Sequence, residues 1–453
     1  MTTIAGRERL AHIALTRFGL GAKPGVITKI GASPKDALIA ELEVPNIALI
    51  NDPLLPTYEQ VCQVVHTARA NEVDCQEREL TARLKKHLEP QVGFVERLVL
   101  FFSNHFSMSV AKDGAILATI GQLERNVIRP NVLGTFEAML LGVMQHPAMQ
   151  CYLDNDDSIG PNSVVGLSRT LGLNHNLARE ILELHTLGVG GGYSEDDIAS
   201  LARVISGWSF VRGWESINQK NGGTPENRGQ FIFRPDWHEP GTQTILGTSY
   251  EDTGIEQGVS VLRDLAHHRS TSQFLAFKLI RHFITDEPTP ELVDPVARAY
   301  RRSGGSIKAM ARAMIDLPAA WTMPLTKART PYELQVAEMR ALRRLYAPSE
   351  RWPFTAALQA LGHLPWMRTT PDGYPDETDF WIAPDAMRIR LETAQLNARK
   401  LAEIAPYQGS ARQLASKLFA SVLSEQSSYA LAEAPDLPTG LALLFMLPEF
   451  QRR

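Results

Sequence analysis

Apolar residues recur at helical spacing along most of the chain, whereas strict alternation of apolar and polar residues occurs in one segment. This pattern predicts a mostly α protein, a large multi-helix globular fold without a parallel sheet. The alternating segment, GQFIFRPDWHEPGTQTILGTSY, turns at Pro240-Gly241 and predicts one small β-hairpin near residues 230–246. Helices are therefore expected to build nearly all of the core.

Residues 174–208, NHNLAREILELHTLGVGGGYSEDDIASLARVISGW, combine a polar helix face, a glycine turn and a second helix. On a helical wheel Asn176, Glu180 and Glu183 fall in one narrow band next to an apolar stripe, so both carboxylates border the core. Arg179 lies four residues before Glu183 and can pair with it. An isolated Glu-x-x-Glu usually marks only a solvated helix face, so a functional interpretation depends on the neighbouring segments.

Two further segments carry polar residues close to apolar ones. The run FVERLVLFFSNHFSMS is apolar enough to be buried, yet it contains Asn104 and His105, which must find partners if they leave water. The loop CYLDNDDSIGPNS carries Tyr152 and Asp154 a short distance before the glutamate helix. We expect these segments and the hairpin to form one cleft, lined by Glu180, Glu183, Arg179, Asn176, His105, Asp154, Asp236 and His238.

Charge and hydropathy exclude several kinds of partner. The chain has 453 residues, of which 46 are Lys or Arg and 50 are Asp or Glu, giving a net charge of −4. This balance exerts no long-range attraction on nucleic acid, so no nucleic-acid partner is expected. No window reaches about 18 uncharged apolar residues, so no transmembrane segment is expected either. The composition predicts no particular oligomeric state.

The cysteines and the first residues bear on the compartment. The three cysteines, Cys62, Cys75 and Cys151, form no disulfide framework, which mildly favours a reducing environment. Arginines interrupt the first apolar stretch, MTTIAGRERLAHIALTRFGLGAKPG, so it lacks the uninterrupted core of a secretory signal. These features favour a cytoplasmic location. A periplasmic or secreted protein trimmed of its signal would look the same, so that alternative stays open.

Several blocks in order along the chain resemble a known family. They are RFGLGAKPG, FFSNHFSMS, HPAMQCYLDN, the ARE-ILELHTLGVGGGYSEDD stretch with its following GW pair, HEPGTQTILG, KLIRHFITDEP and GYPDETDFW. Together they are similar to the domain-of-unknown-function 1800 family, a large group of uncharacterised bacterial proteins. The resemblance implies a single α-helical unit over residues 1–453, or two packed subdomains, with residues 1–325 carrying the site and residues 326–453 forming a C-terminal helical part. It implies no reaction.

The chemistry that best suits these residues is general acid/base hydrolysis of a carbohydrate or a similar polymer. Glu180 or Glu183 would protonate the leaving oxygen, and Asp236 would act as the second carboxylate, with Glu239 or Asp154 as substitutes. The layout is similar to that of the lysozyme-type hydrolases, which set a helix-end glutamate against a hairpin. The residues expected to bind the substrate are Asn176, Arg179, His105, Asn104, Tyr152, Asp154, Trp208 and His238.

Two alternatives stay open. A binding or assembly protein without catalysis would use the same polar residues as internal struts, with Asn104 and His105 capping a buried helix and Trp208 filling the core. A metal-dependent hydrolase would use Glu180 and Glu183 as ligands, but the wheel places His185 away from both glutamates, so no bound metal and no other cofactor is expected. The sequence contains no nucleophile elbow, phosphate loop or dinucleotide fingerprint.

Overall fold

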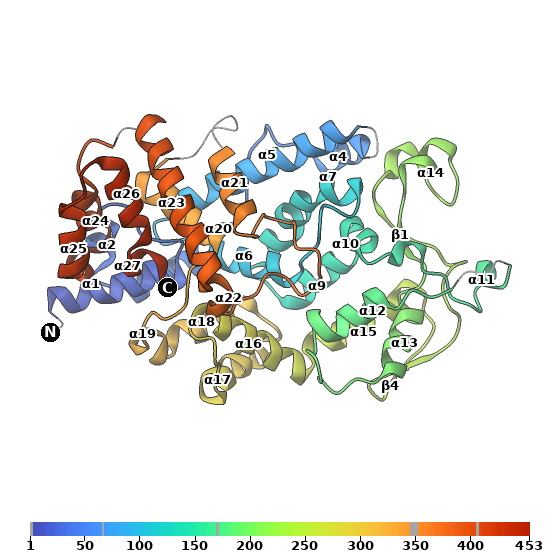
Figure 1. Ribbon diagram of the computed structural model, residues 1–453. Coiled ribbons are helices and arrows are strands. Elements are labelled where there is room, and N and C mark those ends of the chain that lie inside the picture. The colour runs from blue at the N-terminus through green and yellow to red at the C-terminus, as the bar shows by residue number, and fades with distance from the viewer. Residues whose placement is uncertain (1–2, 66–67, 169–171, 345–351, 405–406) are drawn as a thin grey trace.

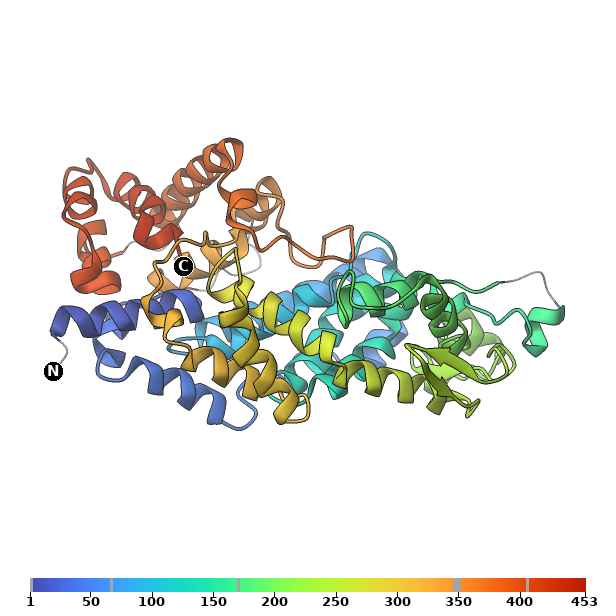
Figure 2. The same cartoon turned by 90° about the horizontal axis from the view of Figure 1, so that it is seen from below.

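The structure, a computed structural model, describes residues 3–65, 68–168, 172–344, 352–404 and 407–453. It is elongated, with helix α1 lying beside the C-terminal helices at one end and the short strands at the other (Figures 1 and 2). The first half contains α1 (Ile4–Ile13), α2 (Val26–Ile30), α3 (Pro34–Glu43), α4 (Tyr58–Val64), α5 (Arg69–Leu88), α6 (Phe94–His105), α7 (Gly114–Leu123), α8 (Arg129–Asn131), α9 (Phe136–Met144), α10 (Pro147–Tyr152), α11 (Val164–Ser168), α12 (Asn176–Glu180), α13 (Glu195–Val204) and α14 (Gly213–Asn218).

The second half is also helical. Its helices are α15 (Ile255–His267), α16 (Arg269–Phe283), α17 (Pro290–Arg302), α18 (Ile307–Asp316), α19 (Ala319–Thr322), α20 (Pro331–Leu342), α21 (Trp352–Ala360), α22 (Thr378–Ile382), α23 (Pro384–Ile404), α24 (Ala411–Phe419), α25 (Glu425–Ala432), α26 (Leu437–Met446) and α27 (Pro448–Gln451). Wide π-helical turns occur at η1 (Ala14–Phe18), η2 (Glu124–Ile128) and η4 (Ile181–His185), and narrow 3₁₀ turns at η3 (Asn155–Asp157), η5 (Pro225–Asn227) and η7 (Ala420–Val422).

The predicted fold class is confirmed, because the described strands form only two antiparallel pairs. Strand β1 (Trp208–Phe210) pairs with β2 (Phe231–Phe233), and β3 (Gln243–Ile245) pairs with β4 (Thr248–Tyr250). The hairpin therefore spans residues 243–250 and lies later than the expected 230–246. It turns at Leu246 and Gly247, both with positive φ, instead of at Pro240-Gly241. Leucine is unusual in such a turn, which explains why the pattern pointed to the Pro-Gly pair.

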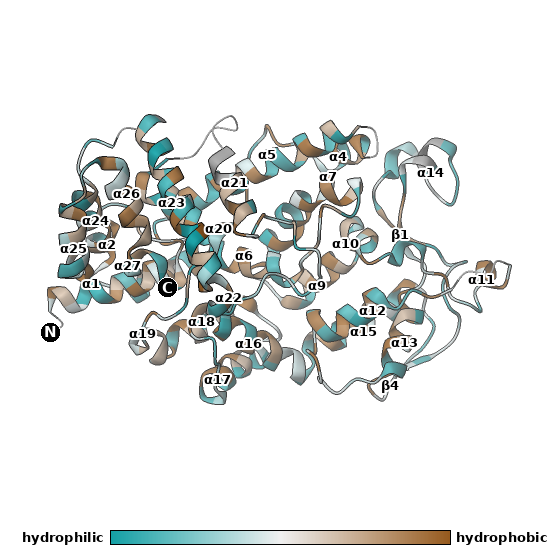
Figure 3. Ribbon diagram, viewed as in Figure 1, coloured by the Kyte–Doolittle hydropathy of each residue, from teal (hydrophilic) through white to brown (hydrophobic). Residues whose placement is uncertain are grey.

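The C-terminal helices show how hydropathy directs the packing. Helix α23 is hydrophilic along most of its length, whereas α26 is mostly hydrophobic (Figure 3). The two helices contact each other, and the narrow apolar side of α23 contributes the buried residues Ala394, Ala398 and Leu401. Small alanine side chains let the helix axes approach closely. None of the described helices is both long enough and apolar enough to cross a membrane.

Helix α20 runs through the middle of the molecule and joins early and late parts of the chain. Its residues 331–341 are all buried. Glu333 pairs with Arg97 of α6 at 2.9 Å and with Arg453 at 2.8 Å. Arg340 donates hydrogen bonds to the main-chain carbonyls of five residues, which are Gly21, His87, Pro90, Gln91 and Val92. Buried charges are tolerated here because each has partners. The proposed subdomain boundary near residue 325 stays a prediction.

We expect Arg340→Met to destabilise the protein by at least about 3 kcal/mol, because it leaves several buried carbonyls without a donor. Arg343→Met is the matched control, since exposed Arg343 makes a single bond to the carbonyl of Pro24. The midpoints of thermal and denaturant unfolding measure both effects. Equal midpoints for the two variants would contradict the role of Arg340 as the link between α20 and the N-terminal region.

Candidate functional site

Glu180 ends α12, and the next five residues form the π-helical turn η4. A π turn is wider than an α turn and frequently occurs at functional sites, because it rotates the following side chains away from their regular positions. Glycine at position 188, with φ of +84°, ends the turn, and its N–H donates to the carbonyl of Leu182. The glutamates therefore stand at a break in the helix, and the turn directs His185 into the core.

The two glutamates lie in different electrostatic surroundings. Burial raises the pKa of half-buried Glu180, nearby Glu183 and Asp372 raise it further, and Arg179 opposes these effects. Glu183 pairs with Arg179 at 3.2 Å, and the same guanidinium reaches Glu195 at 2.8 Å. The surroundings of Glu180 therefore favour its neutral form, whereas Glu183 lies in an ion pair with Arg179.

A loop from the C-terminal part of the chain lies against this helix. The hydroxyl of Tyr152 donates to the carbonyl of Thr369 at 3.1 Å. Burial, followed by Glu180 and Asp372, raises the pKa of Tyr152 to about 12. Lys112 contacts the carbonyl of Tyr152 at 2.6 Å and the carboxylate of Asp154 at 2.7 Å. Tyr152 therefore connects the glutamate helix with the loop that carries Asp372.

Asn104 holds this loop in place. Its amide nitrogen donates to the carbonyl of Tyr374 at 2.9 Å, and its amide oxygen accepts from the Tyr374 N–H at 2.7 Å. Gly373 has a φ of +82°, and a Cβ there would lie 2.5 Å from the carbonyl oxygen of Asn104. Only glycine fits this position, because the backbone conformation and the close contact both exclude a side chain. Asn104 therefore has a positioning role in this structure.

Buried His105 and partly exposed Lys278 form a pair beside the loop. The Nε2 of His105 lies 3.1 Å from the carbonyl of His185, and its Nδ1 lies 3.1 Å from the Lys278 ammonium. Since the carbonyl can only accept and the ammonium can only donate, His105 is neutral with its proton on Nε2. Burial holds the pKa of His105 well below its usual range, and Lys278 adds to this. Burial lowers the pKa of Lys278 to about 8, opposed by Asp376 and Asp372.

Asp372 acts on both Glu180 and Lys278. It acts on the pKa of Glu180, which it raises, and on the pKa of Lys278, which it also raises. The carboxylate of Asp372 itself accepts a hydrogen bond from the Thr370 hydroxyl and lies 3.5 Å from the Arg368 guanidinium. The structure thus brings together residues from α6, α10, α12, η4, α16 and the loop before α22. These residues are Asn104, His105, Tyr152, Arg179, Glu180, Glu183, Lys278 and Asp372.

Other predicted site residues lie differently. Trp208 is fully buried, with Gly258 and Phe231 against its ring, so it fills the core and offers no face for a sugar. Buried His238 lies between the carbonyl of Ser206 and the side chain of Gln257, at 3.1 Å from each, so its ring braces the strand region. The expected substrate-binding roles of Trp208 and His238 are therefore corrected. Both side chains are enclosed by neighbouring parts of the chain and cannot reach a substrate.

The predicted second carboxylate, Asp236, is exposed, and its main-chain carbonyl accepts from Val165 at the start of α11. In the part of the chain that the structure describes, no hydrogen bond or ion pair joins Asp236 to Glu180 or Glu183. Glu239 is buried and binds Asn162 through both carboxylate oxygens. Asn176 is exposed at the start of α12, and Asp154 is exposed beside Lys112. The hairpin region therefore supports the fold of residues 160–168.

Sequence reasoning missed Lys278 and Asp372. Each lies in or directly before a block that carries the family resemblance, KLIRHFITDEP and GYPDETDFW, but neither block places its residues near Glu180. Their positions depend on long-range packing, which periodicity does not reveal. Among the described residues, no group of three or more His, Cys, Asp and Glu side chains is arranged to hold a metal ion.

The fold and the site define a predominantly helical protein with a carboxylate cluster at a helix break, next to a Lys-His pair. The chain belongs to the family described as "Protein of unknown function (DUF1800)", whose model matches residues 13–452. This match confirms the family resemblance of the sequence. No curated protein and no solved structure matches the chain.

His185 provides a test of the buried side of the site. It is fully buried, and neither ring nitrogen has a hydrogen-bond partner within the described ranges. Burial, followed by Lys278, lowers the pKa of His185 to about 3. Because the folded-state pKa lies below the unfolded value of about 6.5, stability is complete above that value and is lost as the pH falls toward the folded pKa.

We expect His185→Leu to reduce the dependence of unfolding free energy on pH between pH 6 and pH 4 by up to about 1.4 kcal/mol per pH unit, the contribution of one proton. Denaturant unfolding at several pH values measures this slope. Ile181→Val on the same turn should cost about 1 kcal/mol at every pH and leave the slope unchanged. An unchanged slope in His185→Leu would mean that His185 is not kept neutral by the fold.

Proposed function

We propose that the protein hydrolyses a carbohydrate or a similar polymer, with Glu180 as the general acid. The observation that carries this proposal is the raised pKa of Glu180 next to a second glutamate that is paired with Arg179. A carboxyl group that keeps its proton near neutral pH can donate it to a leaving oxygen, and a neighbouring carboxylate can stabilise the positive charge that develops. Neighbouring carboxyl groups with different proton affinities are what such catalysis needs.

Asp372 is the better candidate for the second catalytic carboxylate than Asp236. Its negative charge raises the pKa of Glu180 and also that of Lys278. Asp372 would take a proton from water, whose hydroxyl adds to the carbon of the broken C–O bond, or would attack that carbon itself. Glu180 would give its proton to the departing oxygen. Of the predicted substrate contacts, Asn176 is exposed, whereas Tyr152 is buried and its hydroxyl binds the Thr369 carbonyl, so Tyr152 positions the loop instead.

A non-catalytic binding or assembly protein is the second candidate. The observation that favours it is the use of Asn104 and His105 for internal hydrogen bonds, to the Tyr374 backbone and to the His185 carbonyl. These contacts explain both residues without any substrate. They do not explain why Glu180 and Lys278, whose charged forms burial disfavours, lie near the same exposed loop. The hydrolase therefore accounts for more of the site.

We expect Glu180→Gln to lower turnover on a panel of polysaccharides by about 10²–10⁴-fold, the usual contribution of a general acid. Asp372→Asn should cause a comparable loss. Glu195→Gln is the matched control, because exposed Glu195 on α13 also pairs with Arg179 but is not among the groups that shift the pKa of Glu180. Thermal melts check folding, and each assay is repeated with a chelator.

Activity that survives Glu180→Gln would remove Glu180 as the acid, and activity abolished by the chelator would favour a metal-dependent hydrolase instead. A wild type without turnover on any polymer, whose variants are merely less stable, would favour the binding or assembly protein.

The pH profile gives a separate test. Because the pKa of Glu180 is raised, the proton donor stays available to a higher pH than an ordinary glutamate would, and kcat/KM should fall as the pH rises through that pKa. Glu183→Gln removes a neighbouring negative charge, so it should move this falling limb to lower pH while reducing the rate less than Glu180→Gln. Measurement of kcat/KM from pH 4 to pH 9 distinguishes the two, and a limb that does not move would contradict the assignment.

A further inference from the structure

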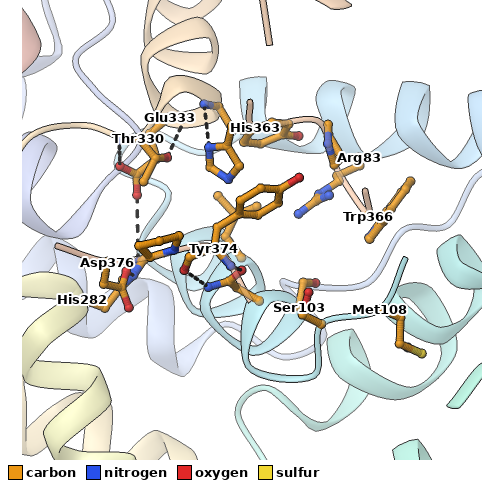
Figure 4. Close-up of a pocket in the computed structure, with 16 residues that line it drawn as sticks. Arg83, Ser103, Met108, His282, Thr330, Glu333, His363, Trp366, Tyr374 and Asp376 are labelled. Carbon is orange, nitrogen blue, oxygen red and sulfur yellow. Dashed lines mark hydrogen bonds and ion pairs between the residues drawn. The ribbon is translucent and has the colours of Figure 1, made fainter. Parts of the chain in front are cut away.

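A cavity of about 70 Å³ lies between α5, α6, α20 and the loop that joins α21 to α22. Figure 4 shows residues that line it, among them Arg83, Ser103, His363, Trp366 and Tyr374, and Tyr332 lines it as well. Asn104 and Tyr374, which bind each other, both line it. We propose that this cavity binds a small organic carboxylate, with the carboxylate group on Arg83 and the apolar part against Trp366 and Tyr374. The proposal does not depend on the hydrolase activity.

The guanidinium of Arg83 is the feature that requires a ligand. Arg83 is 5% exposed, and its guanidinium carbon lies 5.0 Å from the ring centre of Tyr332 and 5.0 Å from that of Trp366. Its Nε forms an ion pair with Glu124 at 3.3 Å but makes no hydrogen bond within the described ranges. The two terminal nitrogens form no hydrogen bond with any residue in the described ranges, and Figure 4 shows the guanidinium directed toward Tyr374 in the cavity. A buried, stacked guanidinium with two free donors fits a carboxylate.

The charge of Arg83 belongs to a buried network of ion pairs. Glu124 also pairs with Arg129 at 3.0 Å and accepts from the hydroxyl of Ser103 at 2.8 Å. Arg129 is also paired with Glu96 at 2.9 Å, so two carboxylates face the two guanidinium groups. A ligand carboxylate would therefore be held by the open hydrogen-bond donors of Arg83 and not by a net positive charge.

The backbone of Trp366 supports a built site. Its φ of +58° lies in the left-handed region, which bulky residues rarely adopt. The strained residue is held by a hydrogen bond from the Val110 N–H to its carbonyl at 2.9 Å, and this conformation places the indole on Arg83. Strain of this kind concentrates at ligand clamps and active sites. Trp366 thus forms one wall of the cavity in a strained backbone conformation. A residue that only filled the core would not need this strain.

The size and walls of the cavity limit the ligand. A water molecule needs about 10–15 Å³ of such volume, so the cavity has room for roughly five to seven water-sized groups. The walls include aromatic rings and the prolines Pro365 and Pro375. The carboxylates of Glu333 and Asp376 also line the cavity, but Glu333 is paired with Arg97 and Arg453, and Asp376 contacts His282 at 2.6 Å. A short-chain carboxylic acid satisfies both features, since it has one charged end and a small apolar body. Inorganic phosphate has no apolar part and matches only the guanidinium.

Calorimetric titration of the full chain with propionate tests the proposal. We expect saturable binding of propionate and at least tenfold weaker binding of propionamide, its neutral analogue, because the amide lacks the charge that pairs with Arg83. Arg83→Lys keeps a positive charge facing Glu124 but loses the two parallel N–H donors of the guanidinium group. It should therefore weaken propionate binding at least tenfold. Arg125→Lys is the matched control, because Arg125 pairs with Glu79 of α5 but does not line the cavity.

Thermal melts confirm that both variants fold. The comparison of propionate with propionamide on the wild type needs no variant, so it decides the question even where Arg83→Lys fails to fold. The proposal is overturned by a wild type that shows no saturable binding of propionate, by equal affinity for the acid and the amide, by phosphate binding more tightly than propionate, or by an unchanged affinity in folded Arg83→Lys.

Discussion

The pair of hydrogen bonds between the Asn104 amide and the Tyr374 backbone is the contact on which both candidate sites depend. It joins the end of α6 to a loop that lies 270 residues later in the chain. The loop presents Asp372 to Glu180 and Lys278, and it presents the Tyr374 ring to the Arg83 cavity. An amide suits this position because it donates and accepts at once, as a main-chain N–H and C=O require.

The interior around this contact contains an unusual number of charged groups. Arg129 is fully buried and binds Glu96 at 2.9 Å and Glu124 at 3.0 Å, and Glu333 of α20 is held between Arg97 and Arg453. Such networks add little net stability compared with apolar packing, but breaking one partner is costly, so they favour a single arrangement of helices. The same rigidity keeps Arg83 in place between two aromatic rings, and it keeps His105 away from water.

The helical fold could be predicted from the sequence, because periodic apolar residues and caps are local signals. The same local signals identified Asn104 and His105 as buried polar residues that need partners, but they could not name Tyr374 and Lys278 as those partners. The wheel placed Glu180 and Glu183 correctly at the edge of the core, yet it assumed a regular helix where the chain forms a π turn. The sequence wrongly indicated binding roles for Trp208 and His238, because aromatic and imidazole side chains occur in cores as well as in binding sites. Only the burial of the side chain distinguishes a core position from a binding position.

The choice of the second catalytic carboxylate also depends on long-range packing that the sequence does not reveal. Asp236 was the better candidate by sequence, since a hairpin acid opposite a helix-end glutamate is a familiar arrangement, whereas Asp372 stands in a proline-rich loop with no periodic pattern. In the folded chain the loop, not the hairpin, reaches the glutamate helix, because Tyr152 and Asn104 both bind its backbone. The proton affinity of Glu180 therefore depends on contacts that α6 and α10 make with a distant loop. A change that releases the loop would alter Glu180, Lys278 and the Arg83 cavity together, although it touches none of their side chains.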